Sequence, residues 1–203
     1  KAIASIVGGI TKIYGVYDVK LSEYVLSFEA IGSVPGETIA FNETDNGFPV
    51  FYPYLPDFMC GANTGIITFK NGTLYTHNTN ALHNNFYGVQ YKSLVSFIVN
   101  MFPSNKKVFQ ALSQETDSAW AAVITTPGGQ STPLLAANFQ EKENFQYAAI
   151  KRDQNTVNVV NPIINGNPMR GQTALITLEY QGTDYNKLFA ANVLFENSER
   201  SNK

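Results

Sequence analysis

The stretch Gly65–Tyr91, GIITFKNGTLYTHNTNALHNNFYGVQY, contains the strongest local structural signal in the chain. Its centre is Asn71-Gly72, which separates two runs that are typical of β-strands. An Asn-Gly pair favours a type I′ turn, because both residues tolerate the positive φ that this turn requires. A two-residue turn predicts three cross-strand pairs, namely Lys70 with Thr73, Phe69 with Leu74, and Ile67 with Thr76.

The alternation of side chains along the two strands predicts two unequal faces. The apolar face carries Ile67, Phe69 and Leu74. The mixed face carries Ile66, Thr68, Lys70, Thr73, Tyr75 and His77. A hairpin with one apolar face is marginally stable alone, so we expect it to pack on a sheet or a core.

The composition favours strands and an all-β fold. The chain has 203 residues, of which 44% are hydrophobic, 13% are aromatic and only 15% are charged. Aromatic and β-branched residues with little charge favour strands over helices. The polar residues are largely Asn, Gln, Ser and Thr, and such a neutral surface suits a protein that is embedded in an assembly. The net charge is -2 and no basic stripe is visible, so we expect no nucleic-acid binding site.

Several further classes are disfavoured. Cys60 is the single cysteine, so no internal disulfide forms, and we expect this thiol to be a buried small hydrophobe in a chain folded in a reducing cytosol. No apolar run reaches the roughly 18 residues of a membrane span. The start, KAIASIVGGI, lacks a Met and the length of a signal peptide. We interpret Lys1 as an internal position of a longer parent chain, and expect that chain or adjacent subunits to cover residues 1–80.

Turn signals divide the chain into antiparallel hairpins. Residues 10–28 and 38–54 predict two hairpins before the one described above, the second turning near Asn46 and Gly47. Pro49 and Pro53 lack an N–H group, so the returning strand is expected at an edge or interrupted. A four-stranded antiparallel meander is the pattern of one propeller blade. We therefore expect a propeller-blade-like region over 1–85, which is a fragment of a larger fold, and a β-sandwich-like closing region over 86–203.

The closing region contains four further strand signals. We expect a buried strand over 94–100, because LVSFIVN is almost continuously apolar, and strands over 107–113 and 119–125. Residues 139–150 are compatible with a short helix or with a strand, and a strand is our expectation. Residues 172–180 and 187–195 predict a hairpin that turns at Gly182. In its first strand Ala174, Ile176, Leu178 and Tyr180 are expected to share one face.

A search for catalytic and metal-binding chemistry gives little. His77 and His83 do not have the spacing of a zinc site, and no Cys pairs accompany them. The acidic pairs Glu43 with Asp45 and Glu141 with Glu143 are interpreted as solvated turn residues rather than as a glycosidase pair. Asp153 and Asn155 have the first spacing of a calcium loop but lack its Gly and its distal Glu. No Ser elbow and no phosphate-binding loop is present, so we expect no enzyme, no cofactor and no metal.

The aromatic run FPVFYPY has two interpretations. Its members Phe48, Phe51, Tyr52 and Tyr54 either pack in a core or between subunits, or stack on sugars from an exposed β surface. Packing is our expectation, and sugar contact remains the alternative.

One family resemblance runs through most of the chain. In order, YGVYDVKLSEYVLSF, ETIAFNE, FPVFYPYLPDFM, FKNGTLYTHN, NNFYGVQY, KVFQALSQETDSAW and FQEKENFQYAAIK resemble the C-terminal part of large tail proteins of podovirus-like bacteriophages. The resemblance spans about Tyr14 to Arg200. It is greatest to the muzzle, the tail-tip assembly of crAss-like phages, and FKNGTLYTHN with NNFYG is its most specific part.

The resemblance implies a structural virion protein that closes or gates the tail and supports host attachment. Its implied partners are other copies of itself in a ring, other tail proteins and a host surface receptor, and its implied site of synthesis is the bacterial cytoplasm. Two alternatives remain open. A receptor- or glycan-binding module predicts exposed aromatics and Asn side chains in one groove, whereas a glycan-degrading tailspike predicts a deep acidic cleft.

Overall fold

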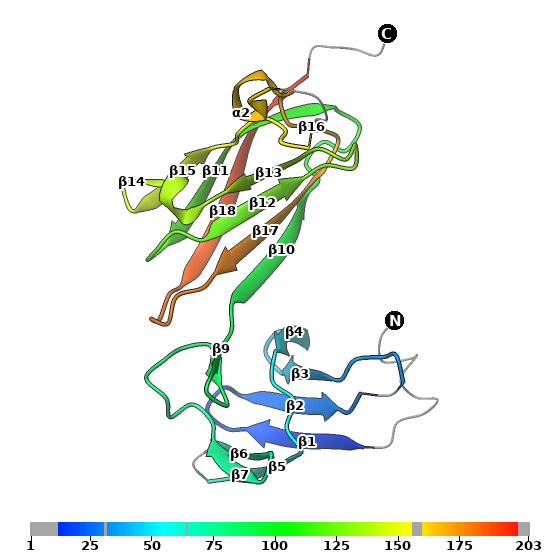
Figure 1. Cartoon of the computed structure of the whole chain (residues 1–203), viewed down its shortest axis with the longest axis vertical. Coiled ribbons are helices and arrows are strands. Elements are labelled where there is room, and N and C mark those ends of the chain that lie inside the picture. The colour runs from blue at the N-terminus through cyan, green and yellow to red at the C-terminus, as the bar shows by residue number, and fades with distance from the viewer. Residues whose placement is uncertain (1–11, 31, 64, 156–159, 199–203) are drawn as a thin grey trace. The chain divides into compact units, whose positions relative to one another are not determined.

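The protein is an antiparallel β structure. The structure is a computed structural model, and it describes residues 12–30, 32–63, 65–155 and 160–198. The chain divides into two compact units, Lys1–Tyr91 and Lys92–Lys203, so the boundary follows Tyr91 where the sequence predicted it after residue 85. Strands dominate both units (Figure 1), which confirms the all-β expectation. The described residues form several open sheets and no propeller. The apolar start at residues 1–11 lies outside the described residues.

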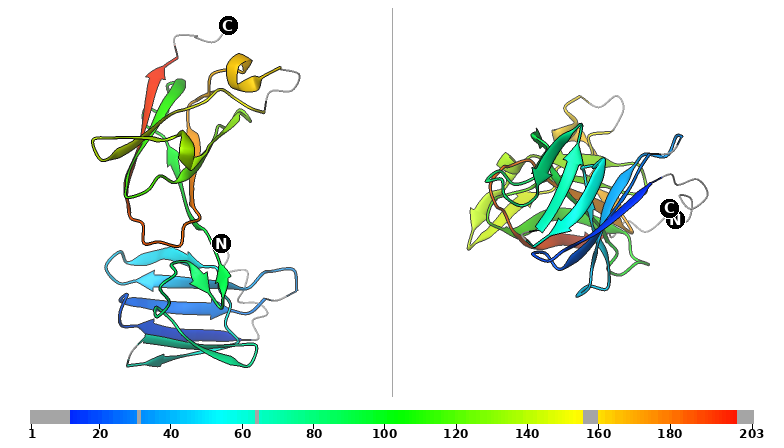
Figure 2. Two further views of the ribbon diagram at one scale, coloured as in Figure 1. Left: turned by 60° about the vertical axis from the view of Figure 1, so that its left-hand side comes forward. Right: turned by 90° about the horizontal axis from the view of Figure 1, so that it is seen from below.

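The first unit contains a four-stranded meander in which each strand pairs with the next along the chain (Figure 2). Its strands are β1 (Ile13–Asp18), β2 (Glu23–Phe28), β3 (Glu37–Asn42) and β4 (Gly47–Tyr52). The hairpins predicted over 10–28 and 38–54 are confirmed. β4 lies at the edge of the sheet and ends directly before Pro53, as its prolines predicted.

The Asn71-Gly72 hairpin belongs to a second, three-stranded sheet made of β5 (Phe58–Ala62), β6 (Gly65–Lys70) and β7 (Thr73–Thr76). Its three predicted cross-strand pairs are all present. Asn71 has φ 51° and Gly72 has φ 75°, as a type I′ turn requires. Asp57, which the sequence analysis did not single out, also holds this turn, because its Oδ2 accepts the backbone N–H of Asn71 at 2.7 Å. This hydrogen bond, and next the one from Lys70, lower the pKa of the Asp57 carboxyl.

The buried face of this hairpin is the mixed one. Ile66, Thr68 and His77 are buried, whereas Phe69 and Leu74 on the apolar face are 37% and 54% exposed. The expectation that the apolar face packs on a core is therefore wrong. Ile66 joins a core cluster with residues of the meander. Thr68 and His77 can be buried beside Ile66 because they hydrogen-bond to each other, which lowers the free-energy cost of removing polar groups from water.

The position of Cys60 follows from the same register. Cys60 is half-buried rather than buried, which corrects the sequence-based expectation. Its cross-strand partner is Ile67, and Phe58 pairs with Phe69, so β5 adds Phe58 and Cys60 to the outer, apolar face of the sheet.

The second unit places two sheets around one core. The first sheet has the order β10 (Ser93–Val99), β17 (Ala174–Tyr180), β12 (Ala121–Thr125), β13 (Ser131–Leu134). The second contains β14 (Gln140–Lys142), β15 (Phe145–Ala149) and β11 (Lys107–Thr116), which also pairs with β16 (Arg170–Gly171) and β18 (Leu188–Asn197). Short helical turns lie at η1 (Ala136–Asn138) and α2 (Pro162–Asn165). The core cluster draws buried residues from both sheets, among them Leu112, Trp120, Ile124, Ile176 and Leu178.

Two expectations for this unit are wrong. Residues 172–180 and 187–195 form no hairpin, because β17 pairs with β10 and β12 while β18 pairs with β11 in the other sheet. Both strands contribute to the same core from opposite sides, so their connection crosses between the sheets. The strand predicted to be buried, β10, is an edge strand. A continuous apolar run marks a strand with two apolar faces, and here one of them is left uncovered.

Buried polar side chains tie the core to its surrounding turns. The Lys107 ammonium donates to the carbonyl groups of Phe102, Asn105 and Gln172, and burial lowers its pKa. The Gln114 amide brackets the backbone of Trp120, donating to its carbonyl at 2.9 Å and accepting from its N–H at 2.8 Å. These bonds satisfy groups whose burial would otherwise be costly.

The turn conformation gives a testable prediction. Gly72→Val should destabilise the first unit by about 1–3 kcal/mol, because a β-branched residue is strained at positive φ. The strain is conformational, since a Cβ at Gly72 would meet nothing within 4 Å. Urea unfolding of the first unit measures the effect. Gly72→Asn is the control and should lose much less stability, and equal stability of the two variants would contradict the type I′ turn.

Candidate functional site: a groove lined by aromatic and asparagine side chains

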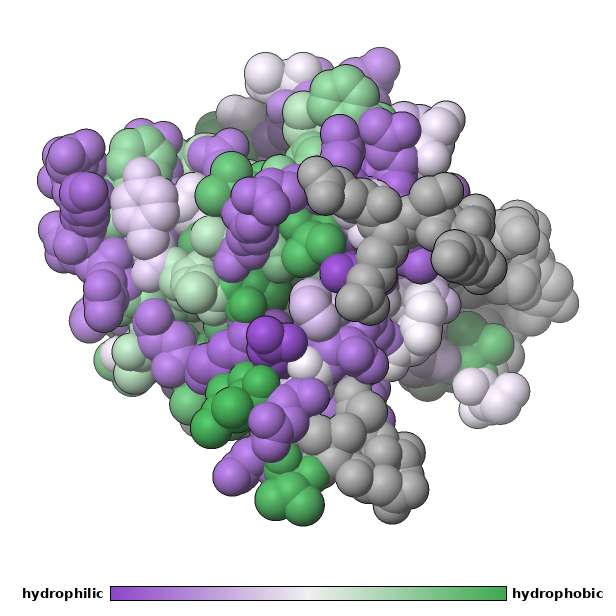
Figure 3. Space-filling model, turned by 90° about the horizontal axis from the view of Figure 1, so that it is seen from above, coloured by the Kyte–Doolittle hydropathy of each residue, from purple (hydrophilic) through white to green (hydrophobic). Residues whose placement is uncertain are grey.

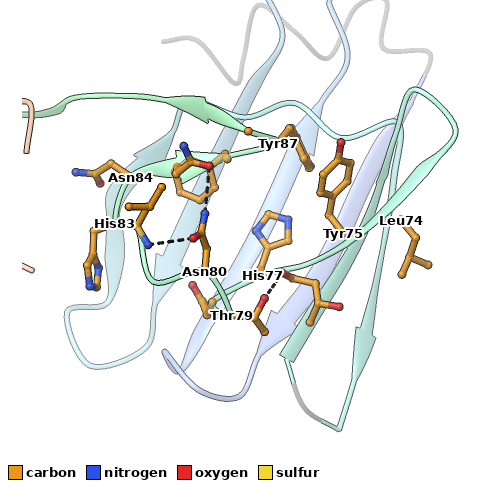
Figure 4. A pocket seen from close by; sticks show the side chains of 14 residues that line it. Leu74, Tyr75, His77, Thr79, Asn80, His83, Asn84 and Tyr87 are labelled. Carbon is orange, nitrogen blue, oxygen red and sulfur yellow. Dashed lines mark hydrogen bonds between the residues drawn. The ribbon is translucent and has the colours of Figure 1, made fainter. Parts of the chain in front are cut away.

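A hollow of the first unit lies in the loop that follows β7. Its volume is about 600 Å³, and its walls come from residues between Leu74 and Gly88 (Figure 4). We call it the groove. The loop closes through a small hairpin of β8 (Asn85–Phe86) and β9 (Val89–Gln90), whose turn residues Tyr87 and Gly88 have φ 54° and 78°. A bulky residue at positive φ is uncommon, so the surrounding contacts must hold Tyr87 in place.

Aromatic rings form one side of the groove. Tyr75 meets Tyr87 edge to face with ring centres 4.7 Å apart. Behind them, Tyr54 lies 4.7 Å from the His77 ring and 4.9 Å from the Phe86 ring. Burial raises the pKa of Tyr54, so its hydroxyl stays protonated at neutral pH. Offset and edge-to-face contacts of this kind stabilise a cluster beyond the area that it buries.

A short chain of hydroxyl groups fixes the position of Tyr87. The Tyr87 hydroxyl donates to Thr68 Oγ1 at 3.0 Å, and Thr68 Oγ1 lies 2.8 Å from His77 Nε2. The Thr68 hydroxyl can therefore accept from Tyr87 while it donates to a neutral His77. Burial lowers the pKa of His77, and the nearby Asp18 opposes this shift only in part. These hydrogen bonds, together with the burial of the ring, favour a neutral His77 imidazole beneath the groove.

Amide side chains brace the other side of the groove. Asn80 accepts from the backbone N–H of Leu82 at 3.0 Å and donates to the Asn85 side chain at 3.2 Å. Asn85 donates in turn to Gln90, and Gln90 donates to the carbonyl of His83. Asn80, His83 and Asn84 lie on the opposite side of the loop from Tyr75 and Tyr87 (Figure 4). A flat aromatic side facing fixed amides is an arrangement that can stack on and hydrogen-bond to a neutral polyhydroxylated ligand.

Comparison with known families identifies part of the chain. Residues 82–153 match the Crassvirus muzzle protein C-terminal domain. The match begins inside the groove loop and ends after β15, so the resemblance expected over Tyr14–Arg200 is shown for this segment. No curated protein sequence matches the chain.

The muzzle-matched segment contains only part of the groove. The β8–β9 hairpin with Tyr87 lies inside the match, whereas Tyr75 and His77 precede it. The sequence analysis did not predict the groove. The available signal was the density of Asn, His and aromatic residues between Tyr75 and Tyr87, which is higher than a simple connection needs.

The four candidate contact aromatics occupy two environments. Tyr54 is buried in the cluster behind the groove, and Tyr52 contacts it while donating to Glu23 Oε2 at 3.0 Å. Phe48 and Phe51 are exposed on β4, at 41% and 69%. Their role in an interface or in sugar contact therefore stays a proposal.

The turn residues singled out by sequence lie at the bends of the chain. Asn46 has φ 49° and Gly47 begins β4. Gly182 follows β17, where a Cβ would collide with the Tyr180 hydroxyl group. Only a glycine fits that position without moving the tyrosine.

None of the candidate acids is among the described residues that line the groove. Glu43 and Asp45 belong to the β3–β4 turn, and Glu141 and Glu143 to the β14–β15 hairpin of the other unit. Asp153 is buried, and its Oδ1 accepts the backbone N–H groups of Ser131 and Asn155, so this aspartate braces a loop. Across the described ranges, no three His, Cys, Asp or Glu side chains gather as metal ligands would. None of the helices in those ranges has the length and apolarity to cross a membrane.

The buried histidine predicts a dependence of stability on pH. Because the folded pKa of His77 lies below its unfolded value of about 6.5, the unfolded chain binds more protons between these two pKa values. Stability of the first unit should therefore fall as pH drops from 7 through that window. Urea unfolding followed by the amide signals of β6 measures it.

Two histidine variants separate this effect from general acid sensitivity. His77→Gln keeps an amide near Thr68 but cannot titrate, so it should flatten the dependence. His83→Gln is the matched control and should retain the wild-type dependence. An unchanged slope in His77→Gln would show that other groups cause it.

Proposed function

We propose that the chain is a structural component of a phage tail muzzle, acting in the virion as a subunit of the assembly that closes or gates the tail and supports host attachment. The match of residues 82–153 to the Crassvirus muzzle protein C-terminal domain carries this proposal. The proposal takes the β1–β4 meander as a blade-like element and the two sheets of the second unit as a sandwich-like element. It includes synthesis in the host cytoplasm and no enzymatic role.

The edges of the second unit support a role in an assembly. Pro133 lies within the edge strand β13 and lacks an N–H group, and β14 is a short edge strand with two charged residues in three. Both features discourage pairing with a further strand. β10, by contrast, is a seven-residue edge strand with the sequence SLVSFIV, which has no charge and no proline. Such an edge is a template for pairing with another chain.

The outer face beside this edge is also apolar. Ile98 pairs with Leu175 across β10 and β17, and the two side chains are 65% and 43% exposed. Leu94 on β10 and Val123 on β12 are exposed at 55% and 42%. Apolar residues that gather on one sheet face are typical of interaction surfaces. We take other copies of this chain, in a ring, and other tail proteins as the partners.

A charge placed on β10 tests this role. Ile98→Lys should reduce incorporation of the protein into virions by about tenfold or more, which corresponds to about 1.4 kcal/mol of lost interface energy. The reason is that an unpaired ammonium would have to be buried between subunits. Quantitative mass spectrometry of purified particles measures incorporation.

The matched control is Val19→Lys. Val19 has the same exposed fraction as Ile98, 65%, but it lies in the β1–β2 turn of the first unit. It should leave incorporation within about twofold of wild type. Normal incorporation of Ile98→Lys, or absence of the wild-type protein from the tail in electron micrographs, would contradict the proposal.

The groove favours a second candidate function, the binding of a host-surface glycan. It brings aromatic and Asn side chains together in one hollow, which is the arrangement that such a module requires. Tyr75 and Asn84 are the best contact candidates, because both line the groove and neither side chain takes part in the hydrogen bonds described above that brace the loop.

Glycan binding is tested on an array of host polysaccharides with the purified chain. Tyr75→Ala and Asn84→Ala should each lower the signal, the tyrosine by about tenfold if a sugar stacks on its ring. Tyr17→Ala, an exposed tyrosine on β1, is the control and should leave it unchanged. Phe51→Ala distinguishes the groove from the exposed aromatics of β4. Absence of any signal from the wild-type chain would reject this function.

A further inference from the structure

The second unit contains a basic pocket at the end of its two sheets. Its volume is about 600 Å³, and the residues that define its charge are Lys106, Arg152 and Arg170, joined by Gln130 and Asn167. These residues come from four separate segments, before β11, between β12 and β13, after β15 and before β16. Seen from the same end of the molecule, hydrophilic residues predominate beside smaller hydrophobic areas (Figure 3).

The charge of this pocket has one sign. Three lining side chains are cationic, and the described lining includes no carboxylate. The ion pairs found among the described residues involve Lys12, Lys70 and Lys92 instead. The nearest acid in sequence, Asp153, directs its Oδ1 to the backbone N–H groups of Ser131 and Asn155. Cations that converge without an acid repel one another, so the pocket favours a bound anion.

Arg170 supplies the decisive observation. Its Nε is buried and has no hydrogen-bond partner among the described residues. A buried guanidinium donor without a partner costs free energy, and no acceptor among the described residues offsets that cost. The Arg170 side chain also lines the pocket, where its charge is available to an anion. The backbone around it is fixed, because Arg170 pairs with Val108 of β11 and its N–H donates to Gln130 Oε1 at 2.7 Å.

The neighbouring groups are also held in place. Gln130 uses its other end to donate to the carbonyl of Pro168 at 3.0 Å, so it braces the segment that carries Arg170. Arg152 donates through Nη1 to the carbonyl of Gly166 at 3.0 Å. A guanidinium has five N–H donors, so this single bond orients Arg152 and leaves donors for a ligand. Two oriented guanidinium groups suit an oxyanion with several acceptor oxygens.

We propose that the basic pocket binds a phosphate ester, with the phosphate on Arg152 and Arg170 and Lys106 at the rim. A free phosphate ion would leave most of a 600 Å³ cavity unfilled, whereas this volume lies in the range of small-molecule sites. An ester of sugar size fits both the charge and the room. The site lies in the second unit and does not depend on the muzzle assignment.

The test uses the full 203-residue chain at low salt with three probes, glucose 6-phosphate, inorganic phosphate and glucose. We expect glucose 6-phosphate to shift the Arg170 side-chain Nε–H signal in NMR spectra and to bind more tightly than inorganic phosphate. Glucose should give no shift. Equal affinity for inorganic phosphate would overturn the assignment of an ester, and no shift with either phosphate would overturn the site.

Charge-removing variants identify the residues. Arg170→Gln and Arg152→Gln should each weaken glucose 6-phosphate binding by about tenfold or more, or about 1.4 kcal/mol. Lys142→Gln removes an exposed charge of the same unit in the β14–β15 hairpin, and should change the affinity by less than about twofold. Circular dichroism verifies that each variant is folded. Weakening by Lys142→Gln equal to that by Arg152→Gln would show a diffuse charge effect and overturn the proposal.

Discussion

The two-residue turn at Asn71-Gly72 is the constraint on which the first unit depends. Because side chains alternate along a strand, a slip of one residue in the pairing of β6 with β7 would reverse every face. With the observed register, Thr68 and His77 lie on the same inner face, where they bond to each other. Tyr87 then reaches the Thr68 hydroxyl, and the aromatic side of the groove is built on that contact. A turn that fixes two positive φ angles thus positions residues far outside it.

The sequence predicted those features of the first unit that depend on neighbouring residues alone. The Asn-Gly register and the edge position of β4 follow from φ preferences and from the missing N–H of proline, which act within a few residues. The buried face of β6 did not follow. The alternation of side chains alone favours burial of the face that carries Phe69. The hydrogen bond between Thr68 and His77 lowers the free-energy cost of burying the mixed face instead.

Long-range pairing explains the other failures. β17 and β18 are neighbours in sequence with matching alternation, and nothing local reveals that their partners lie in β10 and β11. The basic pocket escaped sequence reasoning for the same reason. Lys106, Arg152 and Arg170 are too far apart in sequence to appear as a basic stripe, yet they line one cavity. The composition did indicate a neutral, strand-rich chain with an all-β fold. This property does not depend on which strands pair with one another.

The pairing of β10 with β17 also has a consequence for synthesis. Ser96 and its partner Thr177 are separated by 81 residues. At roughly 5–20 residues per second, a ribosome needs about 4–16 s to make the intervening chain. Throughout that interval the uncharged SLVSFIV segment has been synthesised but its partner strand β17 has not, so it has no strand to pair with. Nascent chains on the same polysome therefore carry a row of unpaired segments at close range, and a chaperone that covers this segment during translation would raise the yield of folded protein.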